Sequence, residues 1–395
     1  VQRRRGVGAP PPCWRAPWFG PLGAVAPAVR GPAPDAPSSA ASAIAWPAEG
    51  AGAAGVDGID AVAASGTAPV SMASISKLVT VLMILDQMPL NVGDPGPTFA
   101  FTSRDRDTYE QYLADDESAL DVPVGGTLTE YQMLQGILMG SAGNYTDRLA
   151  GTIWPSDEVF SAAARAWLDA HSLPGIRLSE PTGIDPDNAA DPASLIRLAE
   201  LALAQPVVAE IVRTRSVELP GAGEVTNTND LLADPAVVGL KTGSLERFYN
   251  LLAAKDITVG TTTVRVYATA LGQSTADGRD QETARLLAEV AAEVSTPRIL
   301  PAGTLAGVVT TAWGATANIV TDADASVILW NGASGTVTTA LDLGEARTAN
   351  AAVGTVKVTG PLDAATVGVH LTADIGDPDA WWRLTHPLQL WGLAP

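Results

Sequence analysis

An apolar segment, residues 72–85, opens with a serine and a lysine three positions apart and predicts a buried helix. Residues at i and i+3 lie on one helix face, so Ser74 and Lys77 would be neighbours there. A serine hydroxyl is a weak nucleophile, and a lysine whose pKa is lowered by burial can activate it. A capping serine followed by a surface lysine is the alternative. Only four lysines occur in the 395 residues, which favours a specific role for Lys77.

A second lysine, Lys241, begins the sequence Lys-Thr-Gly directly after an apolar run, residues 237–240, that predicts a strand. Lys241 and Thr242 could bind a substrate carboxylate. Gly243 would let the substrate backbone approach closely, because it has no side chain to block it. A strand that ends in a turn is the alternative, and the serine–lysine pair earlier in the chain argues against it.

A third segment lies between these two. Residues 134–139 predict a buried helix that runs into the loop Ser141-Ala142-Gly143-Asn144. A hydroxyl beside the nucleophile could relay a proton to a leaving amine. A simple corner between two helices is the alternative.

In this order, the three segments resemble the motifs of the penicillin-recognising serine enzymes. Among them, the chain looks most like the low-molecular-weight penicillin-binding proteins that act as serine D-alanyl-D-alanine carboxypeptidases. Residues 182–188 resemble the family's Ser/Thr-Gly-Leu-Asp-Pro segment, and residues 226–232 resemble its Asn-Thr-Asn-x-Leu-Leu run. The resemblance covers about residues 43–295.

The resemblance implies a role for each matching residue. Ser74 would be the acylated nucleophile, Lys77 its base, and Ser141 the group that passes a proton to the departing D-alanine. Backbone N–H groups of Ser74 and Ser244 would form the oxyanion hole, which stabilises charge in the tetrahedral transition state. The implied substrate-binding residues are Lys241, Thr242, Gly243 and Ser244.

The second motif departs from the family's Ser-x-Asn pattern. If Ser141 is kept in register, Gly143 fills the asparagine position. If Asn144 is kept in register, Ala142 fills the serine position, so the amide is retained and the shuttle hydroxyl is lost. We favour the second alignment because it needs no shift of the loop. Either way, one side chain of the family's motif is absent.

Other site chemistries find little support in the composition. The three histidines lie far in sequence from Ser74, so a Ser-His-Asp triad is not predicted. One cysteine and scattered histidines predict no metal site, and we expect no cofactor. The formal charge of −19 argues against nucleic-acid binding. Cys13, the single cysteine, cannot form an internal disulfide.

Three regions are predicted. Residues 1–42 would be a basic, Pro/Ala-rich, disordered tail and linker; Arg3-Arg4-Arg5 suggests an export signal or membrane anchor, but prolines interrupt the apolar stretch that follows. Residues 43–297 would form the catalytic domain, with first strands at 43–46 and 61–64. Residues 298–395 alternate as in strands and predict a small all-β domain. Its five tryptophans suggest either a module that docks on the envelope or glycan, or core packing, which we favour.

The resemblance implies an α+β fold of the β-lactamase/transpeptidase type, an antiparallel sheet flanked by helices with a helical subdomain. It implies a secreted or cell-envelope hydrolase that removes the terminal D-alanine from peptidoglycan stem peptides and is acylated by β-lactams. The alternatives are a β-lactamase and a catalytically weak scaffold that binds the cell wall. The sequence leaves open the muropeptide, the balance of hydrolysis and transpeptidation, the membrane attachment and the oligomeric state.

Overall fold

The computed structural model describes residues 22–31 and 33–393, which divide into two compact units. The larger unit comprises residues 39–296 together with 329–333. The smaller unit holds the rest of the described chain. The basic cluster Arg3–Arg5 and Cys13 lie outside the described residues. Among the described residues, no helix is long and apolar enough to cross a bilayer, and no group of side chains could hold a metal ion.

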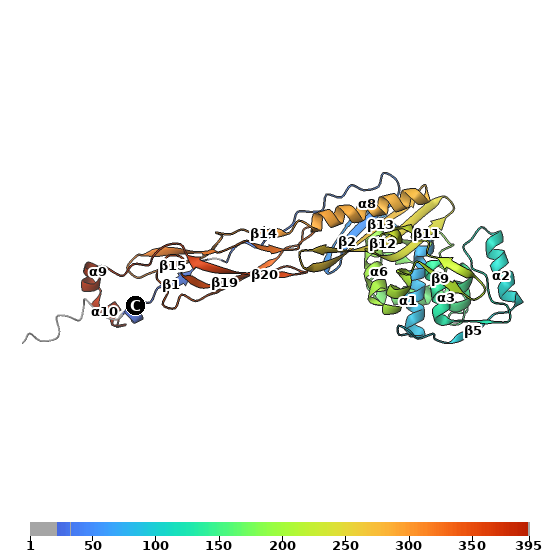
Figure 1. Cartoon of the computed structure of the whole chain (residues 1–395), viewed down its shortest axis with the longest axis horizontal. Coiled ribbons are helices and arrows are strands. Elements are labelled where there is room, and N and C mark those ends of the chain that lie inside the picture. The colour runs from blue at the N-terminus through green and yellow to red at the C-terminus, as the bar shows by residue number, and fades with distance from the viewer. Residues whose placement is uncertain (1–21, 32, 394–395) are drawn as a thin grey trace, which may run out of the picture. The chain divides into compact units, whose positions relative to one another are not determined.

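The larger unit is built on a five-stranded antiparallel sheet with the strand order β11-β12-β13-β2-β3. Its strands are β2 (Ala51–Val56), β3 (Ile59–Ala64), β11 (Val237–Leu245), β12 (Phe248–Val259) and β13 (Thr262–Gln273). Helix α8 (Ala276–Val294) covers one face, and α6 (Pro192–Ala204) lies on the other (Figure 1). Gly55 lets α6 pack closely, because a Cβ there would lie 2.5 Å from Ile196 Cγ2.

A helical subdomain lies beside the sheet. It contains α1 (Lys77–Gln87), α2 (Ser103–Ala114), α3 (Glu130–Met139), α4 (Gly143–Ala150), α5 (Asp157–Ala170) and α7 (Pro206–Val212). Short strand pairs and turns connect these helices: β4 (Val70–Ser71), β5 (Thr98–Ala100), β6 (Thr127–Thr129), β7 (Ile176–Arg177), β8 (Ala189–Ala190), β9 (Ser216–Leu219), β10 (Gly223–Thr226) and the 3-10 turn η5 (Asp230–Ala233). Helix α1 contacts α3, α4, α5 and α6, so residues 77–85 are buried on all sides. This explains why the segment is apolar all round.

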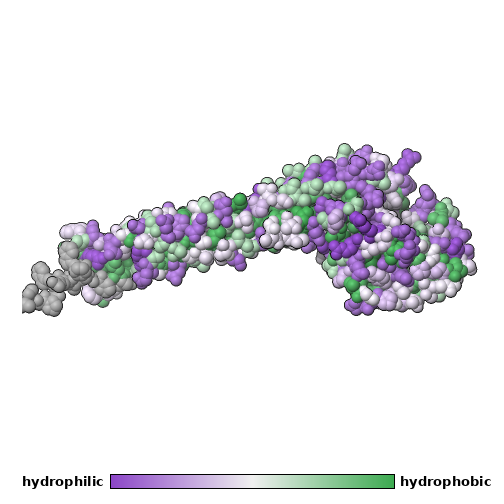
Figure 2. Space-filling model, viewed as in Figure 1, coloured by the Kyte–Doolittle hydropathy of each residue, from purple (hydrophilic) through white to green (hydrophobic). Residues whose placement is uncertain are grey.

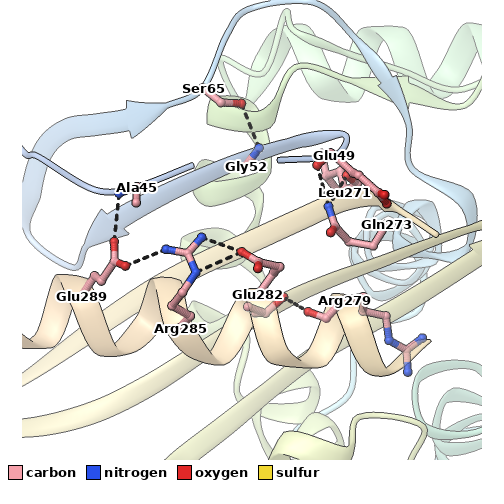
Figure 3. A network of polar contacts seen from close by, with 11 residues as sticks. Ala45, Glu49, Gly52, Ser65, Leu271, Gln273, Arg279, Glu282, Arg285 and Glu289 are labelled. Carbon is pink, nitrogen blue, oxygen red and sulfur yellow. Dashed lines mark hydrogen bonds and ion pairs between the residues drawn. The ribbon is translucent and has the colours of Figure 1, made fainter. Parts of the chain in front are cut away.

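The strand expected at residues 43–46 does not form. The backbone N–H groups of Ala43 and Ala45 donate to Glu293 and Glu289 of α8, each over 3.0 Å, instead of to a neighbouring strand. Arg285 donates to both Glu282 and Glu289, and it thereby holds the Glu289 carboxylate in place (Figure 3). The sheet begins at Ala51, so the expected strand at 61–64 is the second strand, β3.

The smaller unit contains a six-stranded antiparallel sheet with the order β1-β15-β16-β20-β19-β18, and a two-stranded pair, β14–β17. The strands are β1 (Ala28–Arg30), β14 (Arg298–Leu300), β15 (Leu305–Thr310), β16 (Thr316–Thr321), β17 (Ala325–Val327), β18 (Thr336–Leu341), β19 (Ala352–Thr359) and β20 (Ala364–Leu371). A 3-10 turn, η3 (Leu22–Val25), precedes the sheet, and the helices α9 (Ala380–Thr385) and α10 (Pro387–Leu390) follow it.

The segment expected to be a disordered linker differs from the prediction over part of its length. Strand β1 pairs with β15, with Ala28 opposite Thr310 and Arg30 opposite Val308. Ser38 forms a bridge with Ser334. The Pro/Ala-rich composition of this segment gave no sign of a strand. A three-residue edge strand pairs through its backbone and needs no alternation of apolar and polar side chains.

Candidate active site

Ser74 and Lys77 meet at the beginning of α1. Ser74 lies in a 3-10 turn, η4 (Ala73–Ser76), that leads directly into the helix. The Lys77 ammonium donates a hydrogen bond to Ser74 Oγ over 2.7 Å. Ala73 has a left-handed backbone, with φ of 48°, which is uncommon for a residue with a side chain. Ser74, next in the chain, is half-buried at this strained turn.

Burial sets the protonation of Lys77. The side chain is 2% exposed, and the loss of hydration lowers its pKa to about 8. Glu180, Glu117 and Asp147 raise it again in part, since negative charge favours the ammonium form. Loss of the Lys77 proton is therefore far easier near neutral pH than for an exposed lysine, and the neutral amine is the form that can accept a proton from Ser74.

A loop that follows β7 holds Lys77 from the other side. Lys77 donates to the carbonyl of Thr182, and Thr80 Oγ1 donates to the carbonyl of Pro181 over 2.7 Å. Glu180 organises this loop by accepting from Thr182 Oγ1 and Gly183 N–H, each over 2.6 Å. A Cβ at Gly183 would lie 2.2 Å from the carbonyl oxygen of Ala73, so only glycine permits this approach.

Strand β11 forms the opposite wall of the site. A Cβ at Gly243 would lie 2.6 Å from the Met72 carbonyl oxygen and 3.3 Å from the Ser74 nitrogen, which places the strand directly against the serine turn. Thr242 Oγ1 lies 2.6 Å from Thr228 Oγ1. Ser244 is exposed at the end of this run.

Lys241 of β11 is buried near two other basic side chains, Lys77 and Arg279. Lys241 is 1% exposed, and its ammonium donates to the Thr242 carbonyl over 3.0 Å. Burial lowers the pKa of Lys241 well below its usual value, and the nearby charges of Lys77 and Arg279 lower it further. A bound carboxylate would compensate this repulsion, so the arrangement is suited to an anionic group.

Comparison with known proteins relates the fold around this site to solved structures. No protein-family model and no curated protein sequence match the chain. Among solved structures, the Streptomyces K15 DD-transpeptidase matches with a TM-score of 0.54 and 22% identity, over 62% of this chain and 98% of that one. Penicillin-binding protein 5 from Haemophilus influenzae matches with a TM-score of 0.56 and 16% identity, over 89% of this chain and 100% of that one.

The chain has the fold of the penicillin-binding DD-peptidases. This confirms the α+β fold predicted from the motifs. The match to penicillin-binding protein 5 covers more of the chain than the larger unit contains, so it extends into the smaller unit.

In the second motif, the amide of Asn144 is engaged by hydrogen bonds to a neighbouring segment. Asn144 Nδ2 donates to the Leu120 carbonyl over 2.8 Å, and Asn144 Oδ1 accepts from the Leu120 N–H over 3.1 Å. Ala142 is the buried residue directly before α4. Ser141 is also buried, with a left-handed φ of 60°, and no described residue hydrogen-bonds its hydroxyl. The amide of Asn144 therefore anchors a neighbouring loop to α4.

Tyr112 of α2 is a neighbour of this motif that the sequence analysis missed. Its ring lies against Gly143, where a Cβ would be 2.2 Å from Tyr112 Cε1. Its hydroxyl donates to Asp147 over 2.5 Å. Burial raises the pKa of Asp147. No local sequence pattern indicates this contact, because α2 and α4 are brought together only by the fold.

An open cleft of about 700 Å³ borders this cluster. It is lined by Arg104, Asp107, Thr108, Gln111, Tyr112, Asp115, Glu117 and Ile184. Glu117 and Asp147 both act on the pKa of Lys77, so the cleft and the lysine share one electrostatic environment. The site thus combines a serine hydrogen-bonded to a buried lysine, a strand with a glycine against that serine, a second buried lysine and an open cleft with acidic residues.

Proposed function

We propose that the protein is a serine D-Ala-D-Ala carboxypeptidase that removes the terminal D-alanine from peptidoglycan stem peptides. The observation that carries the proposal is the 2.7 Å contact between Lys77 Nζ and Ser74 Oγ, with the pKa of Lys77 lowered to about 8. A serine paired with a deprotonatable amine is suited to acyl transfer. The fold of DD-peptidases supports the same reaction class.

In the first step, neutral Lys77 takes the Ser74 proton while Ser74 Oγ bonds to the carbonyl carbon of the penultimate D-alanine. The N–H groups of Ser74 and Ser244 would stabilise the resulting oxyanion. The C–N bond then breaks, and the leaving D-alanine nitrogen receives a proton. Ala142 has no hydroxyl to relay it, so Lys77, which already contacts Ser74, returns the proton directly. Water finally hydrolyses the Ser74 ester.

The terminal carboxylate of the substrate would lie against Lys241 and Thr242. Lys241 Nζ has only a carbonyl as partner among the described residues, and burial lowers its pKa. A bound carboxylate would raise that pKa and pair with the ammonium form. β-Lactams carry a carboxylate and a reactive carbonyl as well, so we expect them to acylate Ser74. A D-Ala-D-Ala substrate implies an enzyme that works outside the cytoplasm, in the envelope or secreted.

A β-lactamase is a second candidate, because a carboxylate, Glu180, lies close enough to Lys77 to raise its pKa. Such a group could activate water for fast deacylation. However, Glu180 already accepts hydrogen bonds from Thr182 and Gly183, so it is used to hold its loop. A catalytically weak scaffold is a third candidate, favoured by the engagement of Asn144 with Leu120.

Intact-mass analysis after incubation with penicillin distinguishes the three. We expect a stable adduct on the wild type, none on Ser74→Ala, and a normal adduct on Ser76→Ala, whose hydroxyl is buried without a partner. Release of D-alanine from a peptide ending in D-Ala-D-Ala would identify the carboxypeptidase. Hydrolysed drug without an adduct would instead identify a β-lactamase. Intact drug without an adduct would overturn the enzymatic proposal.

A further inference from the structure

A cavity of about 270 Å³ opens on the larger unit, between α5 and the segment that follows it in sequence. Four of its lining side chains are apolar and no more than 5% exposed: Leu168, Leu173, Ile176 and Leu178. On the face of the larger unit drawn in Figure 2, apolar surface residues are dispersed among polar ones. A hollow lined by packed apolar side chains differs from such a surface, because it can remove the apolar part of a small ligand from water.

Two arginines line the same cavity, and both have charge available for a ligand. Arg165 lies one helical turn before Leu168 on α5, and its guanidinium has no hydrogen bond or ion pair with any described residue. Arg177 of β7 contacts Asp187 through a 3.1 Å hydrogen bond to the carbonyl and a 3.5 Å ion pair between mostly exposed side chains. Such an exposed pair contributes little, so an anion could pair with both guanidinium groups.

The remaining polar lining limits the charge of the ligand. Asp169 also lines the cavity, so two arginines and one aspartate give it a net formal charge of +1, in a chain whose formal charge is −19. Ser161 Oγ donates to the Leu178 carbonyl over 2.8 Å and thereby joins α5 to the following segment. The lining thus favours a ligand with one anionic group and an apolar remainder.

The segment that lines the cavity continues into the loop that holds Lys77. Leu178 lies two residues before Glu180, which accepts a hydrogen bond from Thr182 Oγ1 over 2.6 Å. The Thr182 carbonyl in turn accepts from Lys77. A ligand that contacts both α5 and Leu178 would stabilise this folded arrangement, because it binds only where the two segments are in place.

We propose that this cavity is a second ligand site, which binds a small amphipathic anion and restrains the loop that holds Lys77. The apolar chain of the ligand would fill the cavity, and its carboxylate or phosphate would pair with Arg165 and Arg177. Guanidinium groups suit both kinds of anion, because their N–H donors match two oxygens at once. The cavity shares no lining residue with the open cleft beside the catalytic serine. Binding there does not depend on the proposed peptidase activity.

The test measures amide hydrogen–deuterium exchange of the full chain with two anionic probes, hexanoate and hexyl phosphate. Exchange in residues 161–183 should slow with at least one of them, and the tighter probe identifies the anionic group that the site prefers. Hexanol, which lacks the charge, and acetate, which lacks the chain, should bind at least about tenfold more weakly.

Three substitutions locate the site. Arg165→Gln should weaken binding of the preferred probe roughly tenfold, because it removes a charge-assisted hydrogen bond. Asp169→Asn should strengthen binding, because it removes the one negative charge of the lining. Arg213→Gln is the matched control, at an exposed arginine that lines a different cavity, and should bind like the wild type.

Four results would overturn the proposal. Neither anionic probe might slow exchange in residues 161–183, or hexanol might bind as tightly as hexanoate. Arg165→Gln might keep the wild-type affinity. A loss of binding in Arg213→Gln would place the anion in the other cavity. Protection that ends at Leu178 would refute the restraint of the Lys77 loop while leaving the binding site in place.

Discussion

At the scale of single residues, the proposed reaction depends most on Lys77, which contacts Ser74 and has a lowered pKa. Its ammonium has lost hydration but keeps two oxygen partners, the Ser74 hydroxyl and the Thr182 carbonyl. Three carboxylates moderate the fall of its pKa without pairing with it directly. An amine in this position can exchange a proton with Ser74 near neutral pH, which a guanidinium cannot do.

Replacement of Lys77 by Arg should therefore lower the rate of acylation by penicillin about 10²- to 10⁴-fold, the range for loss of a general base. The measurement is the rate of adduct formation by mass spectrometry. Lys255→Arg serves as the control, because Lys255 pairs with Asp234 at the surface and should be replaceable. Acylation at the wild-type rate in Lys77→Arg would refute the role of Lys77 as base.

The pKa of Lys77 also predicts a pH profile. Only the neutral amine activates Ser74, so acylation should rise about tenfold per pH unit below a pKa of about 8 and level off above it. Glu117 raises that pKa, so Glu117→Gln should move the midpoint to lower pH. Stopped acylation assays between pH 6 and pH 10 would check both points. A midpoint that moves upward in Glu117→Gln would contradict the electrostatic assignment.

At the scale of elements, the site depends on how α2 lies over the beginning of α4. The two helices touch where Tyr112 covers Gly143 and donates to Asp147. Asn144 ties the same turn to Leu120, which lies between α2 and β6 in the sequence. The wall of the cleft is thus held by a few side-chain contacts between segments distant in sequence.

Gly143→Ala should displace the Tyr112 ring, because the added Cβ would lie 2.2 Å from Tyr112 Cε1. We expect a loss of about 1–3 kcal/mol in unfolding free energy, typical of overpacking. The double variant Gly143→Ala/Tyr112→Ala should be less destabilised than the sum of the single variants. Denaturant titration of all three chains measures the coupling, and strictly additive losses would show that the two residues are not in contact.

A buried carboxyl at the beginning of α3 gives a second prediction. Glu130 is 0% exposed and both its oxygens lack hydrogen-bond partners among the described residues. Burial raises its pKa from 4.5 to about 7. The folded protein then keeps a proton that the unfolded chain loses, so stability falls as pH rises from 4.5 to about 7 and is constant above that. The cost is at most about 3 kcal/mol.

Glu130→Gln removes this titration while keeping the shape of the side chain. The variant should therefore gain stability relative to the wild type between pH 5 and pH 8, by up to about 3 kcal/mol. Urea titrations at the two pH values would measure the change. Asp94→Asn, at an exposed carboxylate, is the control and should show no gain of this kind. Equal differences at both pH values would mean that Glu130 does not titrate in this range.

At the scale of the whole molecule, the chain crosses between its two units more than once. Residues 329–333 return to the larger unit, although they lie within the C-terminal part of the sequence. Trp330, 2% exposed, donates its indole N–H to Glu293 over 2.6 Å. Asn331 accepts from the Ser42 N–H over 3.1 Å. A boundary drawn near residue 297 would remove this segment from the unit that it completes.

Trp330→Ala should accordingly cost about 3–5 kcal/mol of unfolding free energy, as expected for a buried aromatic side chain. The loss should appear in the unit that contains Ser74. Thermal melting would be measured with and without penicillin bound covalently to Ser74. The transition whose melting temperature changes with the ligand belongs to that unit. Trp391→Ala, at an exposed tryptophan, is the matched control and should leave the melting temperature nearly unchanged.

The sequence by itself determined the local parts of the site. A spacing of three residues in a helical turn places Ser74 beside Lys77, and a strand that runs through Lys241-Thr242-Gly243 follows from a short apolar run. These are relations between neighbours in sequence, which backbone geometry sets. The fold class followed from the order of such motifs and their resemblance to a known family.

Only the tertiary structure decided which distant groups complete the site and its surroundings. The pairing of Asn144 with Leu120, the ring of Tyr112 on Gly143, and the return of Trp330 to the larger unit all join segments that no local pattern connects. The pKa of Lys77 also belongs to this class, because burial and three carboxylates from separate segments set it. These contacts form because the folded chain packs distant segments together. The packing depends on the whole fold and not on the spacing of residues along the sequence.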